Sequence, residues 1–429
     1  MIIRFWFITI ILIILLPGLT GGRVTGQNLP KGNLVIVGGG LEDNNNEVYE
    51  QMIRFAGGNE KASFAVIPSA SGVAVQSFVS FKKALISYGV NPLNIHLIPI
   101  AMVDDDSTTT TDESKWSTNG NDPKLAELVR NCSAVWFTGG DQTRTTKTLL
   151  LADGSQSLVL KAVWDVYLKG GVIGGSSAGA AIMSEVMIGG GNSLGALTMG
   201  VVNDYKGDDF PESQGVMVTK GLGFFPFGIV DQHFDKRGRI GRLIVTLMNN
   251  KDLFNFGFGI DENTALIYDS KLKRLKVAGA SGVTIINAEK ASYIKNDSLS
   301  TIRNLLISRM ENEDSYDLIT GTIIPAEGKR STIGNEYYNI ENPGQAGILS
   351  GYSSEFRDLL SVNLMDNKGA SIIQNLSFYD QQHGFQVTLS KTSESKGFYT
   401  DEPDGEDHYT IVDVKMDIIP VEILINTMK

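Results

Sequence analysis

The sequence predicts an α/β fold: a mostly parallel sheet with helices on both faces, followed by a β-rich extension. Short, continuous apolar runs alternate with segments of helical periodicity from about residue 33 to residue 183. Strands of a parallel sheet are buried on both faces, so they are apolar throughout rather than alternating. Glycines follow two of these runs, at 38–40 and 139–140. Glycines at such points mark the ends of strands, where functional loops of α/β sheets gather.

The individual elements follow from the spacing of the apolar residues. Runs of four to six mostly apolar residues, bounded by polar residues or glycine, predict strands, here at 34–37, 63–68, 94–98 and 134–137. A shorter apolar pair at 172–173 precedes a glycine-serine turn. Apolar residues three and four positions apart predict helices, here at 47–55, 75–88, 122–131 and 158–169. A glycine-serine turn at 174–180 leads into one more expected helix.

Two segments depart from this alternation. Residues 104–120 are rich in Asp, Ser and Thr, which favours a long surface insertion or a helix-flanking loop. From about residue 326 the chain contains short strand-like runs at 370–373 and 385–389 and an acidic stretch at 401–407, with no catalytic motif. We therefore expect three parts, namely a targeting segment at 1–26, a catalytic domain at 27–325 and a β-rich C-terminal extension at 326–429.

The N-terminus has the layout of a secretory signal peptide. Arg4 precedes an apolar run at 5–16, and small and turn-forming residues follow at 17–22. The apolar run is shorter than the roughly 20 residues that span a bilayer. This pattern predicts an exported protein, secreted or periplasmic, with an uncleaved N-terminal anchor as the alternative.

Composition narrows the class of protein. The chain has 429 residues, of which 42% are hydrophobic and 20% charged, as in a soluble globular protein. A formal net charge of −11 argues against nucleic acid as the main partner. The single cysteine, Cys132, excludes an internal disulfide and a zinc site built from cysteines, and the four histidines have no metal-ligand spacing. We therefore expect no metal site.

The first chemical motif is Gly175-x-Ser177-x-Gly179, which has the nucleophile-elbow pattern. A sharp turn from strand to helix exposes the serine, and the flanking glycines allow the chain to turn so tightly. The N-terminus of the following helix points at the serine and can stabilise an oxyanion. An ordinary turn between a strand and a helix is the alternative interpretation.

Two further motifs supply a base and an acid. His233 lies among Asp, Gln and Arg residues in the stretch 230–242, and histidine is the usual base for a serine nucleophile. Asp261 and Glu262 lie between two apolar runs, where a buried carboxylate could orient the imidazole. The alternatives are a solvated helix start for the first stretch and a polar turn between strands for the second.

Together these motifs resemble those of the cyanophycinases, which belong with the dipeptidase-E group of serine peptidases. The stretch 137–142, Phe-Thr-Gly-Gly-Asp-Gln, is similar to the glycine-rich loop of that family, and the likeness runs from about residue 33 to 325, including 308–318 near its end. Four ordered motifs are far more specific than any one of them. The resemblance implies a flavodoxin-like sandwich and a homodimer, with no metal or organic cofactor.

The resemblance also implies the roles of individual residues. Ser177 would be the nucleophile, His233 the general base and Glu262 the residue that orients His233. The backbone amides of Ala178 and Gly140 would form the oxyanion hole. The residues that match the substrate-pocket motif of the family are Gln142, Asp231, Gln232, Arg237, Arg239 and Arg242.

The resemblance implies a substrate as well. Family members hydrolyse multi-L-arginyl-poly-aspartate to β-aspartyl-arginine dipeptides. Arginines would bind the carboxylates of such a substrate, and Asp231 is one candidate partner for its cationic side chains. Ser176 stands where the family usually has Thr, but only Ser177 fits the elbow. Two other functions remain open, an aspartyl dipeptidase or isoaspartyl peptidase that prefers short peptides, and a non-catalytic binding protein on the same scaffold.

Overall fold

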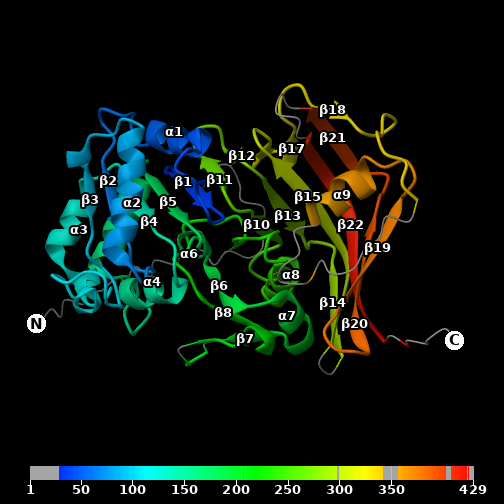
Figure 1. The fold of residues 1–429 in the computed structure, drawn as a ribbon, viewed down its shortest axis with the longest axis horizontal. Coiled ribbons are helices and arrows are strands. Elements are labelled where there is room, and N and C mark those ends of the chain that lie inside the picture. Colours follow the sequence, from blue (N-terminus) through cyan, green and yellow to red (C-terminus); the bar gives the residue numbers. More distant parts are fainter. Residues whose placement is uncertain are drawn as a thin grey trace, which may run out of the picture.

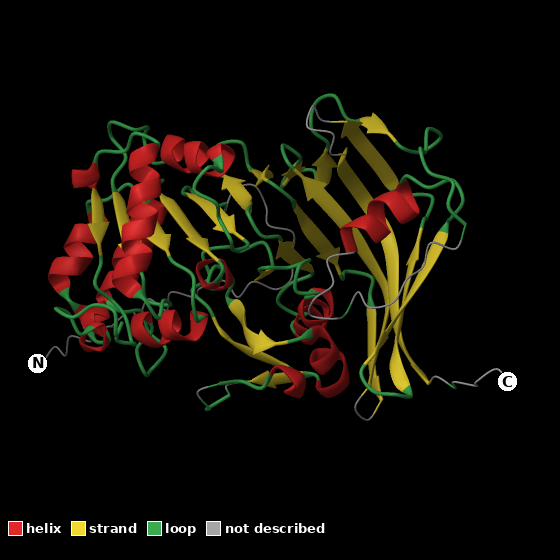
Figure 2. Ribbon diagram, in the orientation of Figure 1, coloured by secondary structure: helices red, strands yellow, loops and turns green. Residues whose placement is uncertain are grey.

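A computed structural model describes residues 29–203, 205–207, 209–296, 299–341, 349, 356–401, 407–422 and 424. The expected signal segment at 1–26 and most of the acidic stretch at 401–407 lie outside the described residues. None of the described helices is both long enough and apolar enough to cross a membrane. Figures 1 and 2 show two bodies of secondary structure side by side, a helix-rich one with the early strands and a strand-rich one with the late strands.

The first sheet is the expected mostly parallel one. Five of its strands, β1, β5, β4, β2 and β3, run parallel to their neighbours, and antiparallel strands extend the sheet beyond β1. In spatial order its strands are β17 (Thr322–Ile324), β16 (Ser315–Asp317), β12 (Arg274–Gly279), β11 (Thr264–Asp269), β1 (Asn33–Val37), β5 (Val172–Ser176), β4 (Ala134–Phe137), β2 (Phe64–Ile67) and β3 (Ile95–Leu97).

Helices cover both faces of this sheet, as the sequence predicts. Alternate residues of β1 enter different cores: Leu34 and Ile36 pack with α3 (Pro123–Arg130) and α5 (Leu158–Leu168), whereas Val35 and Val37 pack with α1 (Asn46–Phe55) and α2 (Ala74–Ser87). The side chains of a strand alternate between faces, so β1 has a buried apolar residue at every position from Leu34 to Val37. The fold class is therefore the predicted α/β class.

A second sheet of ten strands carries the C-terminal part of the chain. Its main path is β18 (Arg330–Ser331), β21 (Lys396–Asp401), β22 (Asp407–Glu422), β15 (Leu299–Glu311), β13 (Gly282–Asn287), β10 (Phe256–Ile260) and β9 (Ile229–Asp231). Three more strands branch from it, β14 (Ser292–Asn296), β19 (Ile372–Phe378) and β20 (His383–Ser390). The predicted β-rich extension is confirmed.

The sheet continues across the domain boundary that the sequence places at residue 325. Strand β15 precedes the boundary and β22 follows it, and the two pair antiparallel along most of their length. The described strands after residue 325 therefore extend the sheet that contains β9 and β10, and no gap in strand pairing separates them from the catalytic part. A small third sheet joins β6 (Val186–Gly191), β8 (Val216–Lys220) and β7 (Val201–Asn203).

The remaining helices are α4 (Gln142–Leu149), α6 (Ala178–Ala181), α7 (Ser193–Met199), α8 (Ile240–Asn249) and α9 (Phe356–Leu360). The turn at residues 261–263 connects β10 in the second sheet to β11 in the first. This turn and the end of β9 bring two of the three chemical motifs to the junction between the sheets.

Candidate active site

The elbow has the geometry that its sequence predicts. Strand β5 ends one residue before Ser177, which has a positive φ of 56°, and α6 begins at Ala178. A Cβ atom on Gly175 would lie 2.5 Å from the carbonyl oxygen of Gly179, and one on Gly179 would lie 2.3 Å from that of Phe137. Both contacts are with backbone atoms that cannot move aside, so glycine is required at both positions.

His233 follows β9 and faces the elbow. Its amide donates to the carbonyl oxygen of Gly38 at the end of β1 (2.7 Å), and its own φ is 46°. Gly39 lies directly against the imidazole, since a Cβ atom there would be 2.2 Å from Cε1 of His233. Gly39 also has a φ of +113°, which favours glycine. The backbone of the glycines after β1 therefore packs against the imidazole of His233.

Ser177, His233 and Glu262 form a continuous chain of hydrogen bonds. Ser177 Oγ lies 2.8 Å from Nε2 of His233, and Nδ1 of His233 lies 2.6 Å from Oε1 of Glu262. A carboxylate can only accept, so Nδ1 carries the proton and Nε2 accepts from the serine hydroxyl. The other oxygen of Glu262 accepts from Nζ of Lys236 at 2.9 Å. This is the arrangement of a serine nucleophile, a base and an acid that orients the base.

The surroundings keep the imidazole neutral and the carboxylate charged. Burial lowers the pKa of His233 below its ordinary 6.5, and the nearby Arg237 and Arg239 lower it further, against the opposing effect of Glu262. Burial acts to raise the pKa of Glu262, but the hydrogen bonds from Lys236 and His233 outweigh it, so the pKa is lowered. At neutral pH, His233 can therefore accept a proton while Glu262 stabilises the resulting imidazolium.

The structure distinguishes the two carboxylates that the sequence placed side by side. Glu262 contacts the imidazole, whereas Asp261 turns to the other side of the loop and accepts from Arg309 (2.8 Å) and the hydroxyl of Ser281 (2.9 Å). Asp261 also accepts from the amide of Asp235 at 3.1 Å. Only Glu262 is positioned to orient His233.

The backbone expected to form an oxyanion hole surrounds Ser177. Ala178 is the first residue of α6, where an amide has no partner within the helix. The 139–140 loop passes the serine closely, because a Cβ atom on Gly139 would lie 3.4 Å from Cβ of Ser177. The next amide, of Asp141, donates to the carbonyl oxygen of Ala70, which anchors this loop to the segment that follows β2. The start of α6 and the loop that carries Gly140 are therefore both beside the nucleophile.

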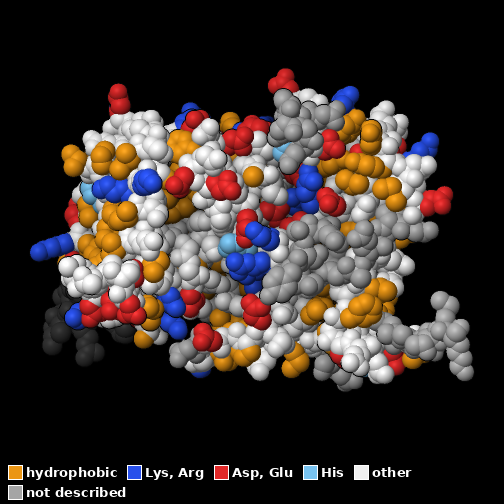
Figure 3. All heavy atoms as spheres, in the orientation of Figure 1, with side chains coloured by type: hydrophobic (Ala, Val, Ile, Leu, Met, Phe, Trp, Pro, Cys, Tyr) orange, Lys and Arg blue, Asp and Glu red, His pale blue; other side chains and the backbone are white. Residues whose placement is uncertain are grey.

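The six residues that match the substrate-pocket motif lie around this centre, and all but Arg237 are buried. Gln142 begins α4, and its amide nitrogen donates to the carbonyl oxygens of Ile188 and Gly189 in β6. Figure 3 shows Lys and Arg side chains gathered beside a histidine near the middle of the face in view. Arg237 is the one member of the set with an exposed side chain.

Asp231 has a partner inside the protein, which the sequence did not indicate. Both of its carboxylate oxygens accept from the guanidinium of Arg242, at 2.8 and 2.6 Å, and the two residues are 1% and 3% exposed. A two-bond fork of this kind is strong and directional. The expectation that Asp231 receives a cationic substrate side chain therefore needs correction, because its carboxylate is already neutralised by Arg242.

Gln232 and Arg239 lie beside this pair. Arg239 donates to the carbonyl oxygen of Gln232 at 2.6 Å, and burial, with Arg242 nearby, lowers its pKa to about 9. The side-chain oxygen of Gln232 is buried and has no hydrogen-bond partner among the described residues. A buried acceptor without a partner is costly, and the described residues supply no donor to this oxygen.

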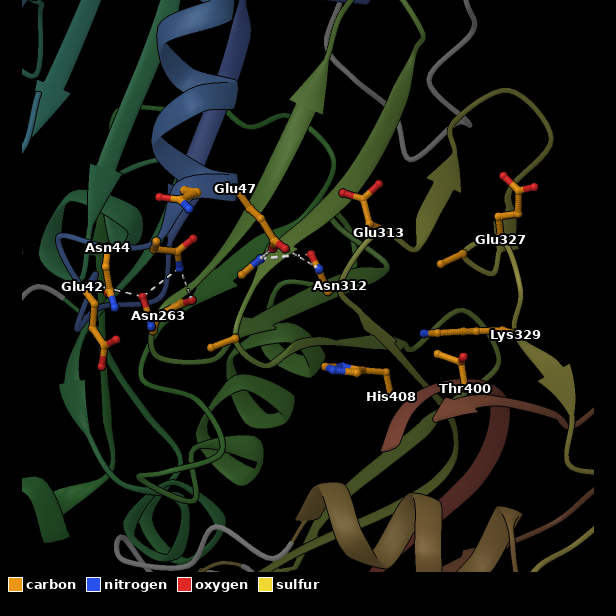
Figure 4. A pocket seen from close by; sticks show the side chains of 15 residues that line it. Glu42, Asn44, Glu47, Asn263, Asn312, Glu313, Glu327, Lys329, Thr400 and His408 are labelled. Atoms are coloured by element: carbon orange, nitrogen blue, oxygen red, sulfur yellow. Dashed lines mark hydrogen bonds between the residues drawn. The ribbon is translucent and has the colours of Figure 1, made fainter. Parts of the chain in front are cut away.

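A separate polar pocket of about 690 Å³ lies on the other side of the 261–263 turn (Figure 4). Asn263 lines it together with Glu42 and Asn44 from the loop before α1 and Glu47 of α1, and His408 of β22 lies on its far side. Asn263 donates its amide to the carbonyl oxygen of Gly39 and accepts from the side chain of Asn45. The pocket contains neither Ser177 nor His233.

Two contributors to the site were not recognised from the sequence. The sequence predicts Gly39 only as part of the glycine run that ends a strand, and it predicts no role for Lys236. The three consecutive glycines after β1 and the short spacing between His233 and Lys236 were the signals present. The contacts of Gly39 and Lys236 depend on the fold, which brings β1, β9 and the 261–263 turn together, so these two sequence signals could not predict them.

Comparison with known proteins agrees with this geometry. Residues 34–275 match the family model described as peptidase family S51. The chain is 30% identical over 293 residues to a cyanophycinase of Geminocystis herdmanii, which covers 66% of this chain and 93% of the relative. It is 30% identical over 306 residues to a cyanophycinase of Synechococcus elongatus, with coverages of 70% and 83%.

Among solved structures, the chain is similar to a peptidase from an acI-B1 Actinobacterium, with a TM-score of 0.41, 22% identity and coverages of 60% and 91%. The family match spans more than half of the chain and includes Ser177, His233 and Glu262. The chain therefore belongs to peptidase family S51 and is a serine-type peptidase.

Proposed function

We propose that this protein hydrolyses cyanophycin, the polymer of aspartate and arginine, to β-aspartyl-arginine dipeptides through an acyl-enzyme on Ser177. The observation that carries the proposal is the hydrogen-bonded chain from Ser177 through His233 to Glu262. Relatives with 30% identity over two thirds or more of their length are cyanophycinases, and this supports the choice of substrate.

The proposed reaction begins with attack of Ser177 Oγ on the scissile carbonyl carbon. His233 Nε2 takes the hydroxyl proton as the Oγ–C bond forms, and Glu262 stabilises the imidazolium. The amides of Ala178 and Gly140 donate to the oxyanion. The C–N bond then breaks, the imidazolium gives its proton to the leaving amine, and an ester on Ser177 remains. A water molecule activated by neutral His233 hydrolyses the ester and restores Ser177.

The charges around the site suit a substrate that carries carboxylates. Arg237 is exposed, and its guanidinium is available for a two-bond contact with a substrate carboxylate. Arg239 is buried and donates to the backbone carbonyl oxygen of Gln232. We therefore assign the substrate carboxylate to Arg237 and Arg239, and a donor group of the substrate to Gln232.

The test of this function is digestion of insoluble cyanophycin granules by purified protein, with the soluble products identified by mass spectrometry. We expect β-aspartyl-arginine from the wild type and none from Ser177→Ala. Short peptides with an N-terminal aspartate are offered in parallel. Cleavage of those peptides without release from granules would identify an aspartyl dipeptidase or isoaspartyl peptidase and contradict the proposed substrate.

We also propose that the protein is exported, on the strength of the basic start, apolar run and small residues at 1–22. N-terminal sequencing of protein secreted from its own cells is expected to begin near residue 27. A chain that starts at Met1 and sediments with membranes would contradict cleavage and favour an anchor. Dimerisation remains a prediction, which sedimentation velocity of the mature protein tests.

A further inference from the structure

A second network of charges lies behind the catalytic residues and reaches into the C-terminal part of the chain. Asp235 follows His233 by two residues, and its two carboxylate oxygens accept from the amides of Phe356 and Arg357, at 3.3 Å each. The amide of Asp235 donates to Asp261 (3.1 Å), the residue immediately before Glu262. The loops that carry the base and its orienting acid are therefore bonded both to each other and to α9.

The network continues through buried ion pairs. Asp261 accepts from Arg309 (2.8 Å), and Nε of Arg309 donates to Glu311 at 3.0 Å. Glu311 accepts from Nε of Arg357 at 2.7 Å, which returns the network to α9. Arg309 and Glu311 are 0% and 1% exposed, so the charges have little access to water. Breaking a buried pair of this kind leaves an uncompensated charge, so its geometry is strongly held.

The backbone that this network holds is strained at the residues that need precision. His233 has a φ of 46° and Asn263, directly after Glu262, has a φ of 51°. Non-glycine residues keep such conformations only where their surroundings impose them. The bond of 2.6 Å between His233 and Glu262 depends on both loops, and displacement by about 1 Å can cost a hundredfold in rate.

We propose that Asp235 is a positioning residue for the hydrogen bond between His233 and Glu262, and that Arg357 of the C-terminal segment acts through the same network. Asp235 lies at the centre of the contacts, since it joins α9 through its carboxylate and Asp261 through its amide. The family match ends at residue 275, so Arg357 and α9 belong to the part of the chain that the match does not cover. The C-terminal segment is thus part of the support of the catalytic centre.

The charge balance agrees with this role. Burial raises the pKa of Asp235 to about 6, the neighbouring Asp261 adds to the rise, and Arg309 opposes it. The two carboxylates therefore repel each other, and Arg309 offsets that repulsion. Arg309 and the α9 amides therefore help to hold Asp235 close to Asp261.

The test uses the full chain with three changes in the network. Asp235→Asn keeps the shape of the side chain and removes its charge, Arg357→Met removes the bonds to Glu311, and Arg357→Lys returns one cation. The matched control is Lys329→Met, which breaks another fully buried ion pair, with Asp314, and removes no side chain that contacts the 233–235 loop. Asp314 keeps its hydrogen bonds from the amide of Glu311 and the hydroxyl of Thr410 in this variant. Urea unfolding gives the folded fraction of each variant.

The readout is the rate at which a fluorophosphonate labels Ser177, per folded molecule, which does not depend on the identity of the natural substrate. We expect labelling to slow roughly 10- to 100-fold in Asp235→Asn and Arg357→Met, with partial recovery in Arg357→Lys. Lys329→Met is expected to label at the wild-type rate. We also expect the downfield proton resonance of His233 Nδ1 to shift or broaden in the first two variants alone.

Wild-type labelling per folded molecule in Asp235→Asn, with an unchanged His233 resonance, would overturn the proposal. If Arg357→Met fails to fold, the labelling rate and the His233 resonance of Asp235→Asn still test the proposal. If labelling of Ser177 slowed equally in Lys329→Met, the proposal would also be contradicted. Slower labelling would then follow from breaking any buried ion pair and not from the contacts of Asp235. Failure of cyanophycin hydrolysis alone leaves the labelling rates unaffected, so the two proposals fail separately.

Discussion

Three residues of the catalytic centre have backbone conformations that side chains normally avoid. Ser177, His233 and Asn263 have φ values of 56°, 46° and 51°. Each lies in a loop that leaves a strand, β5, β9 and β10 respectively. Strain of this kind costs on the order of 1–3 kcal/mol per residue and persists where function requires a fixed geometry. The protein therefore gives up stability at these positions to align the nucleophile, the base and the acid.

The sequence could predict which residue types take part but not all of their partners. Ser177 and His233 were recognisable from the elbow and from the need for a base. The choice between Asp261 and Glu262 depends on which side of the turn each side chain takes, and the resemblance to cyanophycinases rather than the residue pattern singled out Glu262. The Asp231–Arg242 pair was beyond prediction, because the run of cations around His233 does not specify which one turns inward.

Gly39→Ala tests the contact between Gly39 and the imidazole of His233. The added methyl group would lie 2.2 Å from Cε1 of His233, so the ring must move. We expect kcat to fall about a hundredfold, measured on the substrate established by the granule assay. The control is Gly58→Ala, a glycine with a similarly positive φ and no atom within 4 Å of the new Cβ. An unaltered kcat in Gly39→Ala would contradict the placement of the ring.

Glu262→Gln tests the orienting acid. An amide can present a donor to Nδ1 and favour the wrong tautomer, so we expect kcat to fall roughly 10³- to 10⁴-fold with the fold unchanged. Lys236→Met removes only the exposed contact on the other oxygen and is expected to lower kcat less than tenfold. Steady-state kinetics of both variants provide the measurement. A larger effect at Lys236 than at Glu262 would contradict the assignment.

The pH dependence of kcat/KM reports the state of His233. The base must be neutral, so activity rises as pH increases through its pKa. Burial lowers that pKa below 6.5, and the midpoint of the acid limb is therefore expected below pH 6.5. Rates measured between pH 4.5 and 8 on granules or peptides give this midpoint. A midpoint above 6.5 would mean that Glu262 and the surroundings stabilise the imidazolium in the free enzyme.

At the scale of elements, hydrophobic runs predicted the parallel strands β1 to β4 to within one or two residues, and β1, β2 and β4 are buried on both faces. The helix expected after the elbow is only four residues long, Ala178–Ala181, and the chain soon enters β6. Small residues permit the close packing of α6 on the sheet but carry no periodic signal for its length. The residue at which α6 ends could therefore not be predicted from composition.

The Asp- and Thr-rich segment also differs in part from its expected exposure. Glu113 is 0% exposed and Asp105 is 4% exposed, although the segment reads as a polar loop. Asp105 accepts from the amide and hydroxyl of Ser107, and Glu113 accepts from the amide of Asp105 and the hydroxyl of Thr108. Short polar side chains can bond to neighbouring backbone and fold a loop onto itself. The composition of residues 104–120 predicted a turn-rich loop, but it did not predict the burial of Asp105 and Glu113.

At the scale of the whole molecule, the two sheets meet at the catalytic centre. The nucleophile comes from the first sheet, the base and the acid from the second, and α9 supports the second from the C-terminal part. Long pairing between β15 and β22 makes that part continuous with β10. The sequence indicated a β-rich extension but gave no sign of its pairing partner, because strand pairing over about a hundred residues leaves no local pattern.

Stability against acid tests the buried network that joins the two parts. Burial acts to raise the pKa of Glu311, but Arg309 and Arg357 outweigh it and lower the pKa from 4.5 to about 2. A lowered carboxyl pKa adds stability that is complete above pH 4.5 and is lost as pH falls towards 2, on the order of 3 kcal/mol. We expect Glu311→Gln to lower the free energy of unfolding at pH 7 by roughly 3–5 kcal/mol.

The same variant is expected to lose less of its remaining stability than the wild type between pH 4.5 and 2.5. Urea unfolding at several pH values measures both effects. An identical pH dependence in wild type and Glu311→Gln would show that Glu311 is not held charged by the two arginines.

The most direct test of the catalytic assignment is to map the site of fluorophosphonate modification in the purified mature protein by peptide mass spectrometry. The geometry predicts a single label on Ser177, its absence in Ser177→Ala and its persistence in Ser176→Ala. A label on Ser176 or elsewhere, or no label on a protein that still cleaves its substrate, would contradict the role of Ser177 as the nucleophile.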